Sequence, residues 1–383
     1  MNRGWDVIVV GGRVAGAATA MLLARGGLRV LCVDRSRKGS DTLSTHALMR
    51  GGVLQLQKWG LLDGVIAAGT PPVRRTVFDY GGDRVAVSIK PASGVDALYA
   101  PRRTVLDALL VDEAVRAGAE VEFGTPVVGL CKQADGRVTG VLLHDRRTGR
   151  VRAEHAALVV GADGRESLVA REVAATNVFT GQHSGAYLYG YWPGSSSNGY
   201  EWLYRPGLAA GVIPTNNDAS CIFVGGPPNR ISAELAGTST SDAWDRLAAA
   251  VGLGDRALSA HRLGPVRVVR SLSPGYLRTA QGPGWALVGD AGHWMDPIST
   301  HGMTSALRDA ELLADSILGG PTRRPSTASF QPTRDRISLP MLEVSNEIAA
   351  FQWDLTRIRE MLRRMASAMT DEVEALALLG PAA

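Results

Sequence analysis

Residues 7–34 have the sequence VIVVGGRVAGAATAMLLARGGLRVLCVD, in which a segment rich in alanine separates two apolar runs. The first run, Val7–Val10, is uniformly apolar, which is typical of a strand buried on both faces. It ends at Gly11-Gly12, and the small and apolar residues from Ala15 to Gly26 indicate a closely packed helix. The second run, Val30–Val33, has the same strand-like character. This order predicts a β-α-β unit with two parallel strands at the start of the chain.

The turn after the first expected strand has the glycine spacing of a dinucleotide-binding site. Gly11 permits a tight turn, and Gly16 permits close approach of the helix to the strand. Arg13 stands where such sites commonly have another glycine, and an arginine there can itself contact phosphate. The N–H groups and dipole of the helix N-terminus favour a pyrophosphate. Asp34 lies 18 residues after Gly16, where an acidic side chain binds the adenosine ribose, so NADP is disfavoured at this position. We expect the dinucleotide to be bound by Gly11, Gly12, Arg13, Ala15, Gly16, Asp34 and Arg35.

Two later apolar runs end in similar turns. Leu158–Val160 leads into Gly161-Ala-Asp-Gly164, and Ala286–Val288 leads into Gly289-Asp-Ala-Gly292. In an open parallel sheet, ligands bind outside the carboxyl ends of the strands. These strand ends, although far apart in the sequence, are therefore expected to converge on one extended ligand.

The composition excludes several classes of protein. The chain has 383 residues, 45% of them hydrophobic, and a formal net charge of +4, so a disordered chain is not expected. It has no apolar run long enough for a membrane span. Its basic residues are scattered, which does not favour nucleic-acid binding. The three cysteines are far apart and no metal-ligand spacing is present, so we expect no disulfide framework and no metal. No signal-peptide core precedes the first strand, and we expect a cytoplasmic monomer or homodimer.

Strand and helix patterns alternate through the rest of the chain. We expect antiparallel strands over 72–100, a helix from Arg103 to Gly118, short strands over 119–156 and a strand-rich region over 180–275. A helix is expected after Gly302, then a loop over 320–333 and an amphipathic helix over 338–376. Two aromatic triplets alternate at period two, so each is expected on one face of a sheet: Tyr187, Tyr189 and Tyr191, and Tyr200, Trp202 and Tyr204.

Three motifs occur in a specific order along the chain. They are Arg103-Thr-Val-Leu106, then Gly161-Ala-Asp-Gly-Arg-Glu-Ser167, then Gly289-Asp-Ala-Gly-His293 followed by Pro297, Gly302-Met303 and Asp309-Ala310. Together they resemble the FAD-dependent family that contains aromatic hydroxylases, geranylgeranyl-type reductases and flavin-dependent halogenases. The resemblance covers most of residues 5–318.

This resemblance implies non-covalently bound FAD and transient use of NAD(P)H. It implies that Arg103 contacts FAD, that Asp163 is tied to the pyrophosphate and to reduced nicotinamide, and that Asp290 binds the ribityl chain. Pro297, Gly302 and Met303 belong to the turn that the family places against the isoalloxazine, where a helix N-terminus favours anionic reduced flavin. The sequence departs from the family at Thr300 and Thr304, which replace Gly and Asn, and at Ala170, which replaces an arginine.

The expected fold class is α/β, with a Rossmann-type FAD-binding domain built from discontinuous segments, a β-rich substrate domain and C-terminal helices. We assign residues 1–72, 101–178 and 276–320 to the FAD-binding domain. Residues 73–100 and 179–275 form the expected substrate domain, and residues 321–383 form the C-terminal helical region.

Several polar and aromatic residues are candidates for the reaction site. His46, Arg50 and His301 are candidate catalytic residues, and Thr45 is a further candidate for cofactor contact. Alternatively, Ser44 or Thr45 caps a helix, Arg50 lies on the surface, and His301 makes only a structural hydrogen bond. The candidate substrate contacts are Tyr189, Tyr191, Trp202, Tyr204 and Trp294, for which burial in the core is the alternative.

The pattern favours a flavin monooxygenase that hydroxylates or epoxidises an aromatic or polyketide-like small molecule of secondary metabolism, using NAD(P)H and O2. A reductase of the geranylgeranyl type stays open. A halogenase is suggested by Asp296-Pro-Ile-Ser-Thr300, but the sequence has no Trp-x-Trp-x-Ile-Pro, and Lys58 and Lys90 fit the required lysine poorly. A degenerate flavin-fold binding protein without redox activity is the non-enzymatic alternative, which Arg13 favours.

Overall fold

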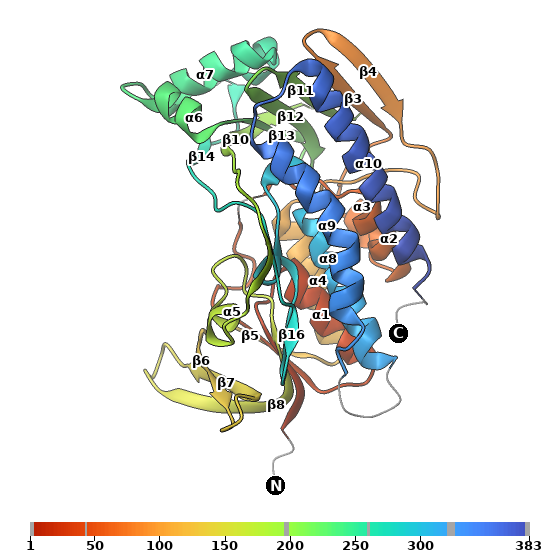
Figure 1. Cartoon of the computed structure of the whole chain (residues 1–383), viewed down its shortest axis with the longest axis vertical. Coiled ribbons are helices and arrows are strands. Elements are labelled where there is room, and N and C mark those ends of the chain that lie inside the picture. The colour runs from red at the N-terminus through yellow and green to blue at the C-terminus, as the bar shows by residue number, and fades with distance from the viewer. Residues whose placement is uncertain (1–3, 43, 195–198, 259–260, 320–325, 380–383) are drawn as a thin grey trace.

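The computed structural model describes residues 4–42, 44–194, 199–258, 261–319 and 326–379. Figure 1 shows an elongated molecule with one β-sheet near each end and long helices along one side. The helices are α1 (Val14–Arg25), α2 (Arg50–Lys58), α3 (Leu62–Ala67), α4 (Arg103–Arg116), α5 (Leu168–Glu172), α6 (Pro228–Leu235), α7 (Thr240–Val251), α8 (Gly302–Leu318), α9 (Phe330–Ala349) and α10 (Leu355–Ala377). Within the described ranges, no helix combines the length and apolar character needed to cross a bilayer.

The first sheet has the strand arrangement of a Rossmann-type fold. Its order is β16-β17-β8-β1-β2-β5, and the pairs from β17 to β5 are all parallel. Strands β6 and β7 extend it antiparallel from β8. The strands are β1 (Trp5–Val10), β2 (Val30–Asp34), β5 (Glu120–Phe123), β6 (Val127–Lys132), β7 (Val138–His144), β8 (Val151–Gly161), β16 (Gln281–Gly282) and β17 (Trp285–Leu287). The expected fold class and the initial β-α-β unit are confirmed.

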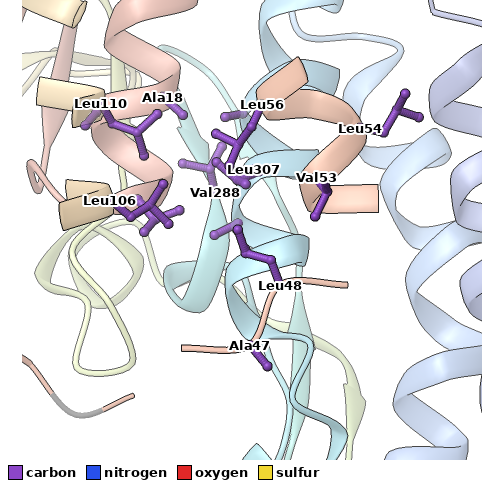
Figure 2. Packing of buried hydrophobic residues seen from close by; sticks show 14 of the residues in the cluster. Ala18, Ala47, Leu48, Val53, Leu54, Leu56, Leu106, Leu110, Val288 and Leu307 are labelled. Carbon is purple, nitrogen blue, oxygen red and sulfur yellow. The ribbon is translucent and has the colours of Figure 1, made fainter. Parts of the chain in front are cut away.

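The apolar run of β1 is buried because the sheet is covered on both faces. Val7 and Val9 belong to the large core that includes α1, α4 and α8, whereas Ile8 and Val10 belong to the core on the opposite face. Figure 2 shows part of the large core, where Ala18, Leu106, Leu110, Val288 and Leu307 pack together. Helix α1 approaches β1 so closely that a Cβ on Gly16 would lie 1.7 Å from the Gly11 carbonyl oxygen. The close packing of α1 on β1 therefore requires a residue without a Cβ at Gly16.

The second sheet carries both aromatic triplets on one face. Its order is β14-β10-β13-β12-β11-β3-β4. Tyr187, Tyr189, Tyr200, Trp202 and Tyr204 all belong to the large core that faces the first sheet. The opposite face packs against α6 and α7 through Trp192 and Trp244, among others. Its strands are β3 (Arg75–Tyr80), β4 (Asp83–Ser88), β10 (Ala186–Pro193), β11 (Tyr200–Arg205), β12 (Leu208–Thr215), β13 (Ala219–Gly226) and β14 (Arg267–Val269).

A small third sheet lies where the chain passes between the two large ones. It consists of β9 (Asn177–Thr180), β15 (Tyr276–Arg278) and β18 (His293–Trp294), in the order β18-β15-β9. Short 3-10 turns are formed by Gly254–Ala257, Gly289–Ala291 and Pro297–Ser299.

The structure differs from the sequence-based expectations at three places. Helices α6 and α7 interrupt the region expected to be strand-rich, because their apolar residues cover the outer face of the second sheet. Helix α9 begins at Phe330, inside the expected loop, of which 320–325 lie outside the described residues. The expected helix over 338–376 is two helices, since the chain turns at Phe351, which has a positive φ of 53°, and restarts with Asp354 as N-cap.

Candidate active site

A cleft of about 710 Å³ follows the carboxyl ends of the parallel strands and continues to the second sheet. It is lined by the ends of β1, β2 and β8 through Val10, Val33 and Ala162, and by Tyr187 and Phe223 of the second sheet. The expected convergence of distant strand ends is therefore present. Most of the predicted cofactor residues line this cleft: Gly11, Arg13, Ala15, Asp34, Arg35, Thr45, Arg103, Asp163, Asp290, Pro297, Gly302 and Met303.

The middle of the cleft has the features of an anion site. Gly11 has a φ of 108°, and a Cβ there would lie 2.3 Å from the Ala162 carbonyl oxygen, so neither the conformation nor the space suits another residue. Arg13 is the N-cap of α1 but makes no side-chain cap, and the first turn has no acidic residue. The helix N-terminus thus presents free N–H groups, and Arg13 and Arg103 lie beside them. Both arginines are paired with Asp107 (3.5 and 2.9 Å), so these three side chains carry one net positive charge.

Asp34 lies at one end of the cleft, at the carboxyl end of β2. Its carboxylate accepts hydrogen bonds from the backbone N–H groups of Gly12 (2.7 Å) and Ser36 (2.6 Å). These contacts fix the Asp34 side chain between the glycine turn after β1 and the chain that follows β2. Gly12 lines a small adjoining pocket that also contains Arg13, Asp34 and Arg103.

Asp163 and Asp290 both line the cleft but differ in their partners. The carboxylate of Asp163 accepts hydrogen bonds from Ser167 Oγ (2.5 Å) and from the N–H groups of Leu168 (2.7 Å) and Val169 (3.2 Å), and so caps α5. Burial raises the pKa of Asp163, although these hydrogen bonds oppose the shift. For Asp290, burial raises the pKa to about 6, with the positive charges of Arg103 and Arg165 opposing. Among the described residues, no side chain or N–H group donates to the Asp290 carboxylate, which leaves it available to a ligand.

The turn before α8 forms the wall next to Asp290. Thr300 has a positive φ of 50°, and His301 is the N-cap of α8 without capping it through its side chain. A Cβ on Gly302 would have no atom within 4 Å. The first turn of α8 has no acidic residue, so this wall is a second free helix N-terminus.

Comparison with known protein families identifies the family to which this fold and cleft belong. Residues 4–319 match the family described as the FAD binding domain. The chain belongs to this family. It is thereby a member of the superfamily of FAD-dependent monooxygenases and related oxidoreductases, as the motifs suggested.

The curated relatives of this FAD-binding protein include three kinds of enzyme. Squalene monooxygenase of Mus musculus is 25% identical over 340 residues, which are 85% of this chain and 57% of the relative. Tryptophan 2-halogenase of Chondromyces crocatus is 25% identical over 328 residues, which are 81% of this chain and 60% of the relative. Digeranylgeranylglycerophospholipid reductase of Methanocella arvoryzae is 26% identical over 335 residues, covering 83% and 78%. The chain thus spans less than two thirds of the length of the first two relatives.

Solved structures show the same fold. PqsL, a probable FAD-dependent monooxygenase from Pseudomonas aeruginosa, superposes with a TM-score of 0.78 at 21% identity, covering 96% of this chain and 99% of that chain. A flavoprotein/dehydrogenase from Cytophaga hutchinsonii gives a TM-score of 0.80 at 20% identity, covering 97% and 92%. The flavin-dependent brominase Bmp2 gives 0.71 at 18% identity, covering 97% and 93%. At these identities the likeness concerns the fold.

FAD fits the residues of this cleft. The two free helix N-termini suit the pyrophosphate and an electron-rich ring system, and Gly302 leaves open space where a side chain would stand. Asp34 and Asp290 both line the cleft, where their carboxylates would offer acceptors to ribose and ribityl hydroxyls of FAD. Gly16 is not in the lining, since its role is the close packing of α1 on β1.

The far end of the cleft is aromatic and apolar. Its lining residues there are Tyr187, Tyr189, Phe223, Val269, Leu272, Trp294 and Met295. Tyr187 donates a short hydrogen bond to Asp296, whose carboxylate also accepts from the N–H groups of Gly185 (2.8 Å) and Ile298 (3.0 Å). Asp296 is 2% exposed and so joins β10 to the turn before α8 from inside the protein.

The structure places two of the candidate catalytic residues outside the cleft lining. The Arg50 guanidinium donates to the carbonyl oxygens of Lys90 (2.7 Å), Ala92 (3.3 Å) and Val95 (2.9 Å), and so fastens the chain after β4. His46 is buried and lies 2.6 Å from the Tyr191 hydroxyl through Nε2. Burial, together with the charges of Arg102, Arg103 and Arg267, lowers the pKa of His46 to about 3. His301 does line the cleft.

The aromatic candidates divide in the same way. Tyr189 and Trp294 line the cleft, but Tyr191 does not, because His46 and the Arg102 guanidinium (3.6 Å from the ring centre) cover it. Trp202 lies against Tyr200 and Phe223, and Tyr204 lies against Tyr80 and Trp353, in the core. Helix α2 begins at Arg50 with Met49 as N-cap, so neither Ser44 nor Thr45 caps it.

Sequence analysis did not identify several residues of the site. Tyr187 and Arg165 line the cleft, and each is a neighbour of a residue that had been predicted. Tyr187 belongs to the aromatic alternation and Arg165 to the Asp-Gly motif, so both patterns contained the signal although neither residue was a candidate for the site. Glu372, from the C-terminal helix α10, contacts His301, and no local pattern identifies it.

Proposed function

We propose that the chain is an FAD-dependent monooxygenase that oxygenates an aromatic or polyketide-like small molecule with NAD(P)H and O2. The observation that carries this proposal is the aromatic and apolar chamber that continues the cofactor cleft beyond Asp290 and the α8 turn. A dry chamber beside the ring of the cofactor suits a substrate that must be held away from water while it reacts. The reaction is expected in the cytoplasm, with the chain acting as a monomer or homodimer.

The chemistry needed from the chain is binding and orientation. Bound FAD supplies electron transfer from reduced nicotinamide and the activation of O2. Tyr187, Tyr189 and Phe223 offer aromatic surface to a substrate, and Val269 and Leu272 close the chamber with aliphatic surface. The ring of Trp294 already has the Arg165 guanidinium over it, 4.7 Å from the ring centre. Asp296 fixes Tyr187 relative to the turn before α8, so the chamber and the cofactor site share one wall.

The positions of the lysines favour oxygenation over halogenation. Lys58 is bound in the interior by Glu311 (2.9 Å) and by the carbonyl oxygens of Leu376 and Leu379, and Lys90 is exposed. Among the described residues that line the cleft, none is a lysine. A reductase acting on isoprenoid double bonds is the second candidate, because the apolar chamber would also accept an isoprenoid chain.

A turnover screen under ¹⁸O2 tests the proposal. Purified protein is loaded with FAD, supplied with NADH or NADPH, and given aromatic, polyketide and isoprenoid compounds with bromide and chloride present. We expect one ¹⁸O atom in a product from an aromatic or polyketide compound. A product that is reduced without label would establish the reductase, and a halogenated product would establish the halogenase. FAD binding without any substrate-dependent oxidation of NAD(P)H would indicate a binding protein.

A variant pair separates the chamber from the cofactor site. Val269→Trp places a large side chain in the chamber and should raise KM at least tenfold or abolish turnover, with FAD affinity unchanged. The matched control is Val85→Trp on the exposed strand β4, which lies outside the cleft lining and should leave both quantities unchanged. Equal turnover in the two variants would show that the chamber does not hold the substrate.

A further inference from the structure

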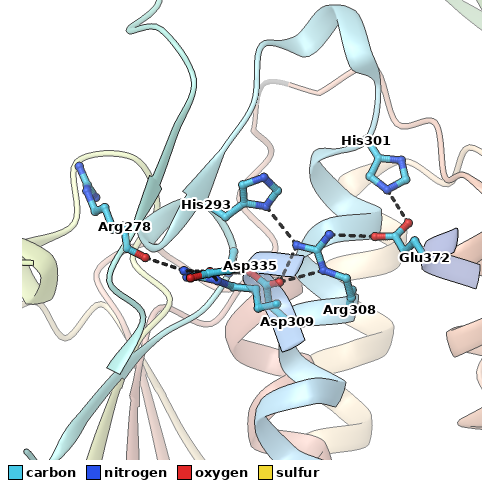
Figure 3. Close-up of polar contacts among 9 residues, drawn as sticks. Arg278, His293, His301, Arg308, Asp309, Asp335 and Glu372 are labelled. Carbon is cyan, nitrogen blue, oxygen red and sulfur yellow. Dashed lines mark hydrogen bonds and ion pairs between the residues drawn. The ribbon is translucent and has the colours of Figure 1, made fainter. Parts of the chain in front are cut away.

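A buried carboxylate from the C-terminal helix contacts the wall of the cleft. Figure 3 shows Glu372 of α10 between His301 and Arg308. Its Oε2 lies 2.7 Å from His301 Nε2, and its Oε1 accepts from Arg308 Nη1 at 2.9 Å. All three side chains are 0% exposed. Glu372 lies outside residues 4–319, the part of the chain that matches the family, so the family pattern does not supply this contact.

The same cluster reaches the turn that carries Asp290. Arg308 donates to Asp309 Oδ1 through Nη2 (2.8 Å) and Nε (3.1 Å), and Asp309 Oδ2 accepts from the N–H of Gly289 (3.1 Å). A continuous series of hydrogen bonds therefore joins His301 at one wall of the cleft to the residue before Asp290 at the other. Both walls belong to the part of the cleft where the flavin ring is expected.

The charges of this cluster do not balance unless His301 is protonated. Arg308 contributes one positive charge, and Asp309 and Glu372 contribute two negative charges. Burial alone would raise the pKa of Glu372, but the charges and hydrogen bonds of His301 and Arg308 outweigh it and lower that pKa, so Glu372 is ionised. A net charge in a fully buried cluster is costly, and a protonated His301 removes it.

The other groups around the cluster do not supply the missing positive charge. His293 accepts a hydrogen bond from Arg308 at Nδ1 (3.1 Å), and burial and the nearby charges of Arg308, Arg334 and His301 lower its pKa well below the usual value, so it is neutral. Arg334 interacts with Asp309 as well as with Asp335, but its charge is matched by that of Asp335, so this pair adds no net charge. Lys58 and Glu311, farther along α8, form a pair of their own.

We propose that Glu372 is a positioning residue that holds His301 as a cation at the N-terminus of α8, and that this cation raises the reduction potential of bound FAD. Reduction of FAD by two electrons and one proton adds one negative charge to it. The cation on His301 lines the cleft, whereas its counter-charge on Glu372 lies behind it, outside the lining. The nearer positive charge favours reduced over oxidised FAD and acts in the same direction as the helix dipole. The inference rests on the FAD site of the proposed function, but not on oxygenation.

The test is the reduction potential of bound FAD, measured without substrate by equilibration with redox dyes. Glu372→Gln keeps a hydrogen-bond acceptor for His301 but leaves the cluster neutral with a neutral histidine. His301→Asn removes the cation itself. We expect each variant to lose at least tenfold in the preference for reduced over oxidised FAD, which lowers a two-electron potential by about 30 mV. The double variant should match Glu372→Gln, since both leave a neutral cluster without the cation, and His301→Asn alone should lower the potential at least as far because Glu372 stays negative.

Glu311→Gln is the matched control. Glu311 is also a buried carboxylate paired with a cation, on α8 itself, but it contacts Lys58 and Gln55 and not His301. The reduction potential of FAD bound to the Glu311→Gln variant should equal that of FAD bound to the wild-type protein. A wild-type potential in His301→Asn would overturn the proposal even if Glu372→Gln fails to fold. A shift in His301→Asn but none in folded Glu372→Gln would overturn the role of Glu372. Because no substrate is involved, the result stands apart from a failure to detect oxygenation.

Discussion

At the scale of single residues, two of the aspartates that line the cleft, Asp163 and Asp290, have separate roles. The Asp290 carboxylate is without a donor among the described residues, whereas Asp163 accepts from two N–H groups of the first turn of α5 and from the hydroxyl of its N-cap, Ser167. Asp290→Ala should weaken FAD binding about 5- to 150-fold, because ribityl hydroxyls lose a partner worth about 1–3 kcal/mol. Asp163→Ala should instead lower the free energy of unfolding by about 1 kcal/mol, and the melting temperature with it, both with and without FAD. Titration of FAD beside thermal melts measures both, and unchanged FAD affinity in folded Asp290→Ala would contradict the assignment.

Asp290 also makes the apoprotein sensitive to pH. Its pKa is raised to about 6 in the folded protein from an ordinary value of 3.8. The folded state therefore binds more protons than the unfolded state between these values, so this residue costs stability as the pH rises from about 4 to about 6. Asp290→Asn removes the cost and should stabilise the apoprotein at pH 7 by up to about 3 kcal/mol relative to its effect at pH 4. Denaturant unfolding at the two pH values measures this difference, and an equal effect at both would refute it.

Two glycines near the cofactor site differ in their surroundings: Gly16 is closely packed, whereas Gly302 faces open space. A Cβ on Gly16 would lie 1.7 Å from the Gly11 carbonyl oxygen, so Gly16→Ala must separate α1 from β1 and should destabilise the protein by several kcal/mol. A Cβ on Gly302 meets no protein atom within 4 Å, and alanine suits a helix better than glycine by about 0.5–1 kcal/mol. Gly302→Ala should therefore keep or raise the melting temperature of the apoprotein while weakening FAD binding. Unfolding and FAD titration of both variants check this contrast.

At the scale of elements, Asp296 joins strand β10 to the turn before α8. Asp296→Ala leaves the Tyr187 hydroxyl and the N–H groups of Gly185 and Ile298 without their acceptor. At about 1–3 kcal/mol for each buried group, a loss of 3 kcal/mol or more of unfolding free energy is expected. Tyr187→Phe removes only one of the donors and should cost about 1 kcal/mol, with FAD affinity retained. Chemical denaturation ranks the two variants, and equal losses would show that the backbone donors find other partners.

At the scale of the whole molecule, the two large sheets are expected to unfold together. The chain passes between them after α3, after β4, after β9 and after β14, and one core contains residues of both sheets, such as Val7 and Tyr204. Thermal unfolding should give one transition by circular dichroism and by tryptophan fluorescence. FAD at a hundred times its dissociation constant should stabilise that transition by about 2.7 kcal/mol. Two transitions, of which FAD shifts only one, would show that the sheets unfold independently.

The sequence by itself determined the first sheet and the cofactor. The period of the apolar runs and the glycines at Gly11 and Gly16 specify a β-α-β unit, because strand burial and helix packing depend on residues close together in the chain. The order of the three motifs then indicated FAD, and the family match confirmed it. The aromatic alternation of β10 likewise predicted one face of a sheet, as observed.

Only the tertiary structure decided which of these side chains meet the ligand. Tyr189 and Tyr191 share a face of β10, yet His46 and Arg102 cover only the second, and both come from segments far away in the sequence. Arg50 turns to the carbonyl groups after β4, because those partners are 40 to 45 positions away in the sequence and lie nearby only in the folded chain. Glu372 reaches His301 across 71 positions of sequence. The spacing of apolar residues within a segment indicates which of its side chains are buried. The partner of a buried charge depends instead on how the helices pack against one another.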